Sequence, residues 1–415
     1  MTRSTSELAR VFGRIGLQSF GGPAAQIALM HKELVEDRDW LSEEDFLRAL
    51  SFCMLLPGPE AMQLATYSGW KQKGIWGGLI AGGLFVFPGA FVIMCLALAY
   101  GAYGTLEWVQ TLFIGIQAAV VVIVIRALRK VAKKALAGSV PLIIAVLAFL
   151  ALYVAKVPFP IVIILAAGAG AVFMSDNKSG VVPVSADLSR LPLVIIVGGT
   201  IWAAPLAIAL VMDAPFLLEI GIFFSKLAVV TFGGAYAVLA YMAQAVVGDF
   251  AWLTAPQMLD ALGLAETTPG PLILVTQFVA MVAGLAEGGV STALLAGVMT
   301  LWVTFVPCFI WIFAGAPLID WLSGQPRLQA ALKGIAAAVV GVIANLSLWF
   351  AFHVFFGSVE PIYGVLLPVI GTVKWMPIVI AVLASLLLFG AKQNLFKVLI
   401  ICAIAALCLT WGFGA

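Results

Sequence analysis

Two short motifs that break helices each occur twice in this chain, and together they are suited to binding an anion. Phe20-Gly21-Gly22 recurs as Phe232-Gly233-Gly234, and Pro57-Gly58-Pro59 recurs as Pro269-Gly270-Pro271, both at an offset of 212 residues. Glycine admits positive φ and proline removes a backbone donor, so each motif interrupts an apolar stretch that would otherwise be helical. The helix halves that remain point free N–H groups and positive dipole ends toward the break, which favours an anion there. A simple kink or a close-packing glycine is the alternative at any single break.

The same offset pairs two cations, Arg14 and Lys226, each six residues before the phenylalanine of its FGG motif. A cation within an apolar span costs about 2.5–3.5 kcal/mol on insertion scales, so its presence there needs a reason. We expect the two to face one doubly charged anion from opposite sides. Snorkelling of these long side chains to the membrane interface is the alternative. Arg48, which matches Asp260, is a weaker candidate.

Carboxylates and neutral donors flank the same motifs. Glu60 directly follows the first PGP and Glu266 precedes the second. Either carboxyl could carry a proton if desolvation keeps it neutral, or it could pair with a cation or cap a helix. Nearby hydroxyls and an amide could donate to oxyanion oxygens. The predicted substrate-binding set comprises Arg14, Ser19, Phe20, Gly21, Gly22, Pro57, Gly58, Pro59, Gln63, Lys226, Thr231, Gly233, Gly234, Thr267, Thr268, Pro269, Gly270 and Pro271, with Glu60 and Glu266 as proton-coupling candidates.

The composition places these motifs in lipid. Of 415 residues, 63% are hydrophobic and 10% are charged, whereas soluble domains average about 25% charged residues. A membrane crossing needs roughly 20 apolar residues. Thirteen segments meet this expectation: 8–30, 46–70, 75–100, 106–126, 140–155, 158–174, 191–212, 215–243, 256–281, 289–314, 327–351, 361–390 and 395–413.

The two copies of the motifs belong to an internal repeat of the whole segment pattern. Residues 12–59 and 224–271 share 17 identities in 48 positions. The first repeat spans 1–174, a polar linker and a lone span occupy 175–213, and the second repeat spans 214–415. Six segments return the chain to its starting side, so the extra span makes the second copy begin on the opposite face. The prediction is an all-α polytopic membrane protein with two inverted-topology repeats, an architecture common among secondary transporters.

The basic residues predict the orientation. With the N-terminus in the cytoplasm, sixteen of the 22 lysines and arginines fall on the cytoplasmic side and three on the other. This is the asymmetry that the positive-inside rule describes. The N-terminal residues do not have the pattern of a cleaved signal peptide.

Several classes of function lack the residues they need. The five cysteines are scattered without a CxxC pair, and His31 and His353 are isolated. We therefore expect no metal site and no cofactor, which argues against a membrane redox enzyme. The net charge of +2 and the lack of a long basic run argue against nucleic acid.

Five stretches around the motifs resemble one known family. LQSFGGPAAQIALM, LLPGPEAMQLATYSGW and FVFPGAFVIM in the first half, and VTFGGAYAVLAYM and AETTPGPLILVTQFVAM in the second, are similar to the chromate ion transporter family in its two-domain long-chain form. The resemblance covers nearly the whole chain. It implies a bacterial or archaeal inner-membrane exporter of chromate, driven by the membrane potential or a proton gradient, with the FGG and PGP segments and their charged neighbours forming the site. Its partners would be the oxyanion and the lipid bilayer, with a homodimer left open. A sulfate or molybdate carrier and a passive anion channel are the alternatives.

Overall fold

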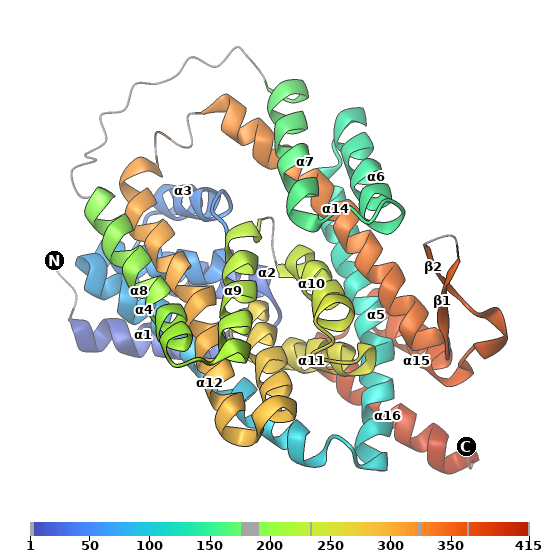
Figure 1. Cartoon of the computed structure of the whole chain (residues 1–415). Helices are drawn as coiled ribbons and strands as arrows, with labels where there is room; N and C mark the ends of the chain where they lie inside the picture. Colours follow the sequence, from blue (N-terminus) through green and yellow to red (C-terminus); the bar gives the residue numbers. More distant parts are fainter. Residues whose placement is uncertain are drawn as a thin grey trace.

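The computed structural model describes residues 4–175, 191–232, 235–319, 321, 325–362 and 365–413, and it is almost entirely helical (Figure 1). The first half contains α1 (Thr5–Gln18), α2 (Pro23–His31), the π-helical turn η1 (Lys32–Glu36), α3 (Glu43–Cys53), α4 (Glu60–Tyr103), α5 (Glu107–Ala135), α6 (Ser139–Tyr153) and α7 (Phe159–Phe173). Next come α8 (Leu191–Val211), α9 (Pro215–Val230), α10 (Ala235–Gln244), the π turn η2 (Ala245–Asp249), α11 (Ala255–Thr267), η3 (Leu272–Leu274), α12 (Val275–Gly315) and η4 (Ala316–Leu318). The chain ends with α14 (Pro326–Phe355), β1 (Val359–Ile362), β2 (Val365–Pro368), η5 (Ile370–Thr372), α15 (Trp375–Ser385), η6 (Leu386–Gly390) and α16 (Leu395–Phe413).

Local structure repeats at the offset seen in the sequence. The Ser42 hydroxyl accepts from a backbone N–H at the start of α3, and Thr254, 212 residues later, caps α11 in the same way. Such caps satisfy donors that a helix start leaves unpaired. Before each cap, the backbone N–H of a tryptophan donates to the carbonyl six residues earlier. Trp40 donates to Leu34, and Trp252 donates to Val246. The repeated sequence therefore encodes repeated backbone structure.

Two of the helices are hairpins rather than rods. α4 turns at Lys73–Gly74, where Gly74 has φ +61°, and α12 turns at Gly288–Gly289, where Gly289 has φ +76°. The arms of each hairpin pack so closely that a side chain on Gly77 or Gly284 would collide with the opposite arm. The predicted segment ends near residues 70–75 and 281–289 coincide with these turns.

The two halves are interlocked by packing. α14 of the second half lies along α6 and α7 of the first, whereas α5 lies along α15 and α16, and α4 packs against α12 (Figure 1). Gly115 on α5 contacts the backbone of α16, and the matching Gly334 on α14 contacts the backbone of α7. Each glycine leaves room for a backbone that a side chain would exclude. Every half thus depends on the other for its core.

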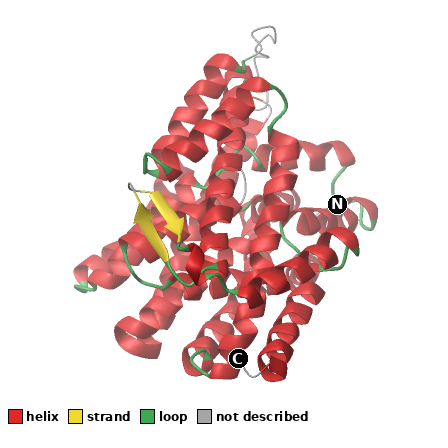
Figure 2. Cartoon of the chain, turned by 90° about the vertical axis from the view of Figure 1, so that its right-hand side faces the viewer, coloured by secondary structure: helices red, strands yellow, loops and turns green. Residues whose placement is uncertain are grey.

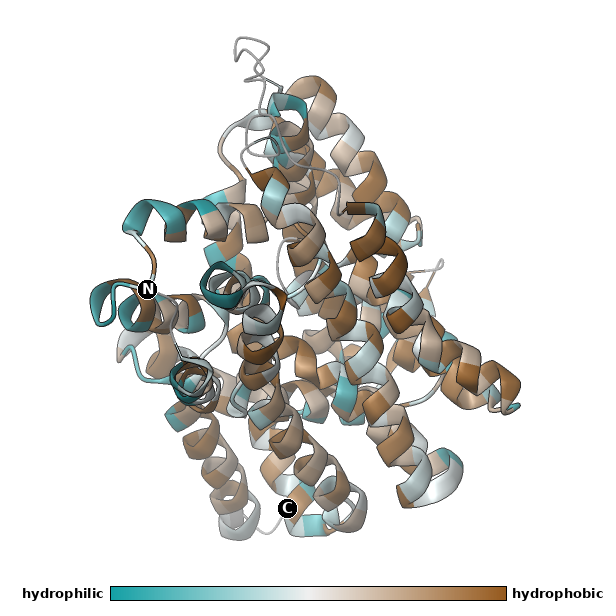
Figure 3. Ribbon diagram, turned by 90° about the vertical axis from the view of Figure 1, so that its left-hand side faces the viewer, coloured by the Kyte–Doolittle hydropathy of each residue, from teal (hydrophilic) through white to brown (hydrophobic). Residues whose placement is uncertain are grey.

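Among the described residues, six helices are long and apolar enough to cross a membrane: Glu60–Tyr103, Glu107–Ala135, Leu191–Val211, Leu272–Leu318, Pro326–Phe355 and Leu395–Gly412. Shorter apolar helices accompany them, and hydrophobic residues make up most of the length of the long helices (Figure 3). The chain is therefore a multi-pass membrane protein. The count of thirteen segments, the domain boundaries and the inverted orientation stay predictions, and most of the predicted polar linker, residues 176–190, lies outside the described residues.

One predicted helical segment is partly wrong. The segment predicted at 361–390 begins as the antiparallel hairpin β1–β2, in which Val359 pairs with Pro368 and Ile362 with Val365 (Figure 2). The first α-helix of this segment, α15, starts only at Trp375. Pro361 and Pro368 lack the backbone donor that a helix interior needs, and β-branched residues favour extended structure. The fold is thus all-α apart from this hairpin.

Candidate functional site

The two FGG motifs end helices in the same way. α1 ends at Gln18 and α2 begins at Pro23, with Gly21 at φ +87° and Gly22 at φ +78° between them. In the second half α9 ends at Val230 and α10 begins at Ala235. The predicted helix breaks are therefore present. Gly233 and Gly234 themselves lie outside the described residues.

The PGP motifs break the next helices. Gly58 adopts φ +117° and Gly270 φ +89°, conformations that favour glycine. Pro59 and Pro271 then precede the first residues of α4 and η3, where a missing N–H costs nothing. In both halves, a short helix thus leads into the motif and a new helix leaves it.

Each PGP motif is hydrogen-bonded to the FGG segment of the other half. The Gly58 N–H donates to the Thr231 carbonyl at 2.8 Å, and the Gly270 N–H donates to the Ser19 carbonyl at 2.9 Å. Both partners obey the 212-residue offset, so the pair of bonds is reciprocal. The four breaks therefore form two equivalent crossings, each made by both halves.

Buried amides support the crossings. The Gln26 side chain donates to the Gly270 carbonyl at 2.7 Å and to the Ser19 carbonyl at 3.2 Å. Gln63 donates to the Pro57 carbonyl at 2.7 Å. The side-chain oxygens of both glutamines are buried without a partner. Gln26 was not among the residues predicted from the sequence, and its match in the second half is Val238, which cannot donate.

The hydroxyls of the predicted set are already engaged. Ser19 donates to the Ile15 carbonyl at 2.6 Å and the matching Thr231 to the Leu227 carbonyl at 2.5 Å. Thr267 and Thr268 likewise donate to Leu264 and Ala265. In this conformation these hydroxyls offer no free proton to an oxyanion. Their visible contribution is to stabilise the helix ends from which the crossings are built.

The two matched cations are exposed on α1 and α9 rather than buried at the helix breaks, so their predicted role in binding the anion stays a prediction. The buried stripe of α1 runs through Phe12, Ile15 and Ser19, and Arg14 lies off it, with 57% of its side chain exposed and Nε 3.8 Å from a Glu33 oxygen. Lys226 is also exposed and lines an open hollow on the outer side of α9. That hollow contains Glu219 and Asp249, whose charges would oppose an anion. Phe20 is exposed as well.

A different set of cations lies beside the breaks. Arg126, Lys130 and Lys134 are spaced by four residues along α5, which places them on one face of that helix. Lys130 and Lys134 are near enough to Glu60 to act on it electrostatically. Arg126 acts in the same way on Tyr236, whose hydroxyl donates to a Glu266 oxygen at 2.7 Å. This basic face of α5 thus lies near Glu60 in the first half and near Tyr236, the hydrogen-bond partner of Glu266, in the second.

The spacing of these three residues is a signal that the sequence contains, although from the sequence they served only as evidence of orientation. A period of four along an apolar helix is sufficient to identify a charged face. Which elements this face meets could not be read from the spacing, because Glu60 and Tyr236 belong to helices of different halves.

Asp260 is a buried acidic residue within α11. The Tyr100 hydroxyl and the Gln117 amide each donate to one of its oxygens at 2.7 Å. These donors come from α4 and α5, so the cluster attaches α11 to the first half. Arg48, which matches Asp260 in sequence, pairs with Glu44 on α3 instead.

The apolar spans and crossed helix breaks define the architecture of a multi-pass membrane protein, and comparison with known families identifies its class. The family model described as chromate transporter matches residues 6–172 and 218–409, which are the two stretches separated by the linker region. The chain belongs to this family. It is therefore a transport protein rather than an enzyme.

Three curated relatives agree with this assignment. The chain is 31% identical over 345 residues to the chromate transport protein of Cupriavidus metallidurans, covering 83% of this chain and 82% of that protein. It is 33% identical over 347 residues to the chromate transport protein of Pseudomonas aeruginosa, covering 82% and 79%. A probable chromate transport protein of Synechococcus elongatus is 31% identical over 343 residues, covering 82% and 83%. No solved structure matches the chain.

Proposed function

We propose that this protein exports chromate, or a similar tetrahedral dianionic oxyanion, from the cytoplasm as a secondary transporter. The observation that carries the proposal is the reciprocal crossing, in which Gly58 bonds Thr231 and Gly270 bonds Ser19. Because each break in one half is held by the other half, a movement at one crossing is transmitted to the second. The family assignment and the names of the relatives support chromate as the substrate.

The basic face of α5 supplies the charge that a dianion requires. A dianion that leaves water needs compensation by cations or by many donors. Arg126, Lys130 and Lys134 are exposed, and they lie near Glu60 and near Tyr236, which hydrogen-bonds Glu266. A cleft lined by one sign of charge raises the local concentration of its counter-ion. We assign this face to anion entry from the cytoplasm, since the positive-inside rule places the C-terminal end of α5 there.

The orientation follows from the same proposal. We place the protein in the inner membrane with its N-terminus in the cytoplasm. The basic end of α5 then lies on the cytoplasmic side and the α6–α7 loop on the opposite side. An odd number of spans before the second repeat then inverts it. In inverted repeats, the substrate site forms at the repeat interface, which is where the crossings lie.

The membrane potential is sufficient to drive export. Moving one charge through 100 mV is worth about 2.3 kcal/mol, so a dianion gains about twice that when it leaves an inside-negative cell. This corresponds to roughly thousandfold expulsion, at 1.4 kcal/mol per factor of ten. Glu60 and Glu266 would add proton coupling if they exchange protons during the cycle.

Flux measurements in oriented vesicles test the proposal. Chromate movement is followed under an imposed potential, with and without a pH gradient, and with sulfate and molybdate as competing substrates. We expect potential-driven chromate accumulation. If sulfate or molybdate is carried instead, the alternative substrate is correct, and flux that only dissipates gradients identifies a channel.

A further inference from the structure

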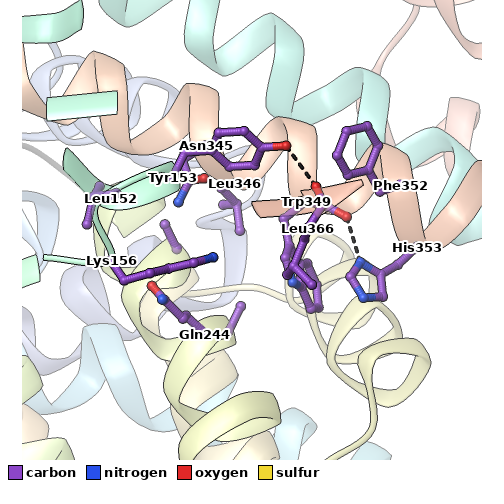
Figure 4. A pocket seen from close by; sticks show the side chains of 12 residues that line it. Leu152, Tyr153, Lys156, Gln244, Asn345, Leu346, Trp349, Phe352, His353 and Leu366 are labelled. Carbon is purple, nitrogen blue, oxygen red and sulfur yellow. Dashed lines mark hydrogen bonds between the residues drawn. The ribbon is translucent and has the colours of Figure 1, made fainter. Parts of the chain in front are cut away.

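A partly open cavity lies at the junction of the two halves, and two of its polar lining residues, Lys156 and Gln244, are exposed. It is lined by the α6–α7 loop, α10, α14 and β2 (Figure 4). Its polar residues are Tyr153, Lys156, Gln244, Asn345 and His353. The volume of about 70 Å³ accommodates on the order of five water-sized groups. That is the scale of one small anion with four oxygens.

Internal symmetry relates this cavity to the basic face of α5. The offset of 219 residues that matches Gly115 with Gly334 also matches Arg126, Lys130 and Lys134 with Asn345, Trp349 and His353. All three of these partners line the cavity. The second half therefore places an uncharged polar face where the first half places its cations.

The cavity obtains its positive charge from elsewhere in the chain. Lys156 reaches in from the α6–α7 loop, between Gln244 on α10 and the start of the α14 face at Asn345 (Figure 4). No ion pair of Lys156 is found among the described residues, and none of the described lining residues is acidic. Lys374 is close enough to His353 to act on it electrostatically.

The neutral lining groups leave donors for a ligand. The Tyr153 hydroxyl donates to the Leu366 carbonyl at 2.8 Å, and His353 Nδ1 donates to the Trp349 carbonyl at 2.8 Å (Figure 4). The amides of Gln244 and Asn345 make no such bond among the described residues. An ammonium group with two amides is a donor set for oxyanion oxygens, because amide N–H groups and a lysine provide charge-assisted hydrogen bonds.

We propose that this cavity is a second oxyanion-binding site, distinct from the helix crossings, with Lys156, Gln244 and Asn345 as its donors. The inference rests on the proposed function, since it assigns the cavity to the same class of substrate. Under the proposed orientation, it lies at the outer end of the transport path, where the anion is released.

Equilibrium dialysis of the full-length protein in detergent against radiolabelled chromate tests the site. We expect Lys156→Gln to remove one class of bound chromate or to weaken it at least about tenfold, while Lys156→Arg retains it. Lys392→Gln is the matched control, because Lys392 is also a loop lysine with left-handed backbone, φ +50° against +51° for Lys156. Asn345→Leu, which changes no charge, should weaken the same class, and it decides the question if Lys156→Gln fails to fold.

Identical binding curves for Lys156→Gln, Asn345→Leu and the unmodified protein would overturn the second site, and so would a complete lack of chromate binding. Chromate flux of the unmodified protein in vesicles tests the proposed function separately. Flux with unchanged binding in the variants removes only the second site. Binding that depends on Lys156 without flux removes only the proposed function.

Discussion

The helix pairs α2–α3 and α10–α11 occupy matching positions in the two repeats but pack differently. α10 lies against α14, and α11 packs against α5, α12, α14 and α16. α2 and α3 pack mainly against α4 and their own neighbours. Most residues of α11 are buried, including Asp260, whereas α2 buries only Gln26 and Met30. The second pair is thus docked on the bundle and the first is not.

This difference determines which polar face is covered. Gln244 at the end of α10 lines the cavity together with Asn345 and His353 of α14. The matching face of α5, with Arg126, Lys130 and Lys134, has no comparable cover from α2, and its cations are exposed. The matching helix faces thus differ: the face of α14 is covered by α10, whereas the face of α5 is exposed. Under the proposed inverted orientation, exchange of these arrangements between the halves would open the fold to the opposite side, as in alternating access.

The largest effect is expected where the halves cross. A Cβ at Gly58 would lie 2.8 Å from the Cys308 sulfur, at φ +117°, whereas a Cβ at Gly270 meets the Leu274 side chain at 3.0 Å. Overpacking costs about 1–3 kcal/mol. We expect Gly58→Val to lower chromate flux at least about tenfold, the factor that 1.4 kcal/mol represents, and Gly270→Val to do less. Gly83→Val, which meets nothing within 4 Å, is the control. Equal flux in all three variants would mean that the crossings are not required.

Neutralising the open basic face should weaken substrate capture. Lys130→Gln with Lys134→Gln removes two charges beside Glu60, so we expect the half-saturating chromate concentration at the cytoplasmic side to rise about tenfold. Arg129→Gln with Lys133→Gln removes the same charge from the neighbouring face, where Arg129 stacks on Phe389. Half-saturation measured in inside-out vesicles for both double variants decides between a specific face and general attraction, and equal shifts would favour the latter.

The Gln26 side chain donates hydrogen bonds to the crossing, and the matching residue of the second repeat, Val238, cannot do so. Gln26→Leu leaves the buried Gly270 carbonyl without the amide donor, which should cost about 1–3 kcal/mol. Val238→Leu, at the matching position, should cost less than about 1.5 kcal/mol as a small hydrophobic change. Thermal unfolding in detergent compares the two. A smaller loss for Gln26→Leu than for Val238→Leu would show that the amide bridge adds nothing.

His31 makes the undocked pair sensitive to pH. Its ring, at the C-terminal end of α2, lies 2.7 Å from a Glu43 oxygen and 3.0 Å from a Glu36 oxygen. The hydrogen bond to Glu43, and then the charges of both glutamates, raise the pKa of His31 above its usual 6.5. Its stabilisation is therefore complete below pH 6.5 and is lost as pH rises through the higher folded-state pKa. Both glutamates are exposed, so the effect should stay below about 1 kcal/mol.

Hydrogen exchange of α2 and α3 between pH 5.5 and 8.5, corrected for intrinsic rates, would measure this loss. The matching positions in the second repeat are Ala243, Gly248 and Ala255, so α10 and α11 should show no equivalent change. His31→Ala should abolish the dependence in α2 and α3. A dependence that survives this substitution would assign it to another group.

The smallest effect is expected for the matched cations. Arg14 and Lys226 lie off the buried stripes of α1 and α9. The double variant Arg14→Gln with Lys226→Gln should keep chromate affinity within about twofold, because exposed charges contribute little. Affinity measured in detergent, with melting temperature as the check on folding, is sufficient. A tenfold loss would restore these two residues to the binding site.

The sequence by itself determined the features that depend on nearby residues. Gly21, Gly58 and Gly270 adopt the positive φ that their motifs predict, because that preference belongs to glycine itself. The repeat, the membrane composition and the family resemblance were also readable, since all three are properties of residue types and spacing. The stripe that leaves Arg14 exposed is likewise encoded in the helical period of the apolar residues of α1.

Tertiary structure alone decided which parts meet. Gly58 bonds Thr231 and Gly270 bonds Ser19 across the two halves, and no local preference links residues that lie so far apart in the chain. The same applies to the α5 face, whose meaning depends on Glu60 and Tyr236 from other helices. The docking of α10–α11 but not of α2–α3 has the same origin. Matched sequences can pack in two ways when the free-energy difference lies in contacts between helices rather than within them.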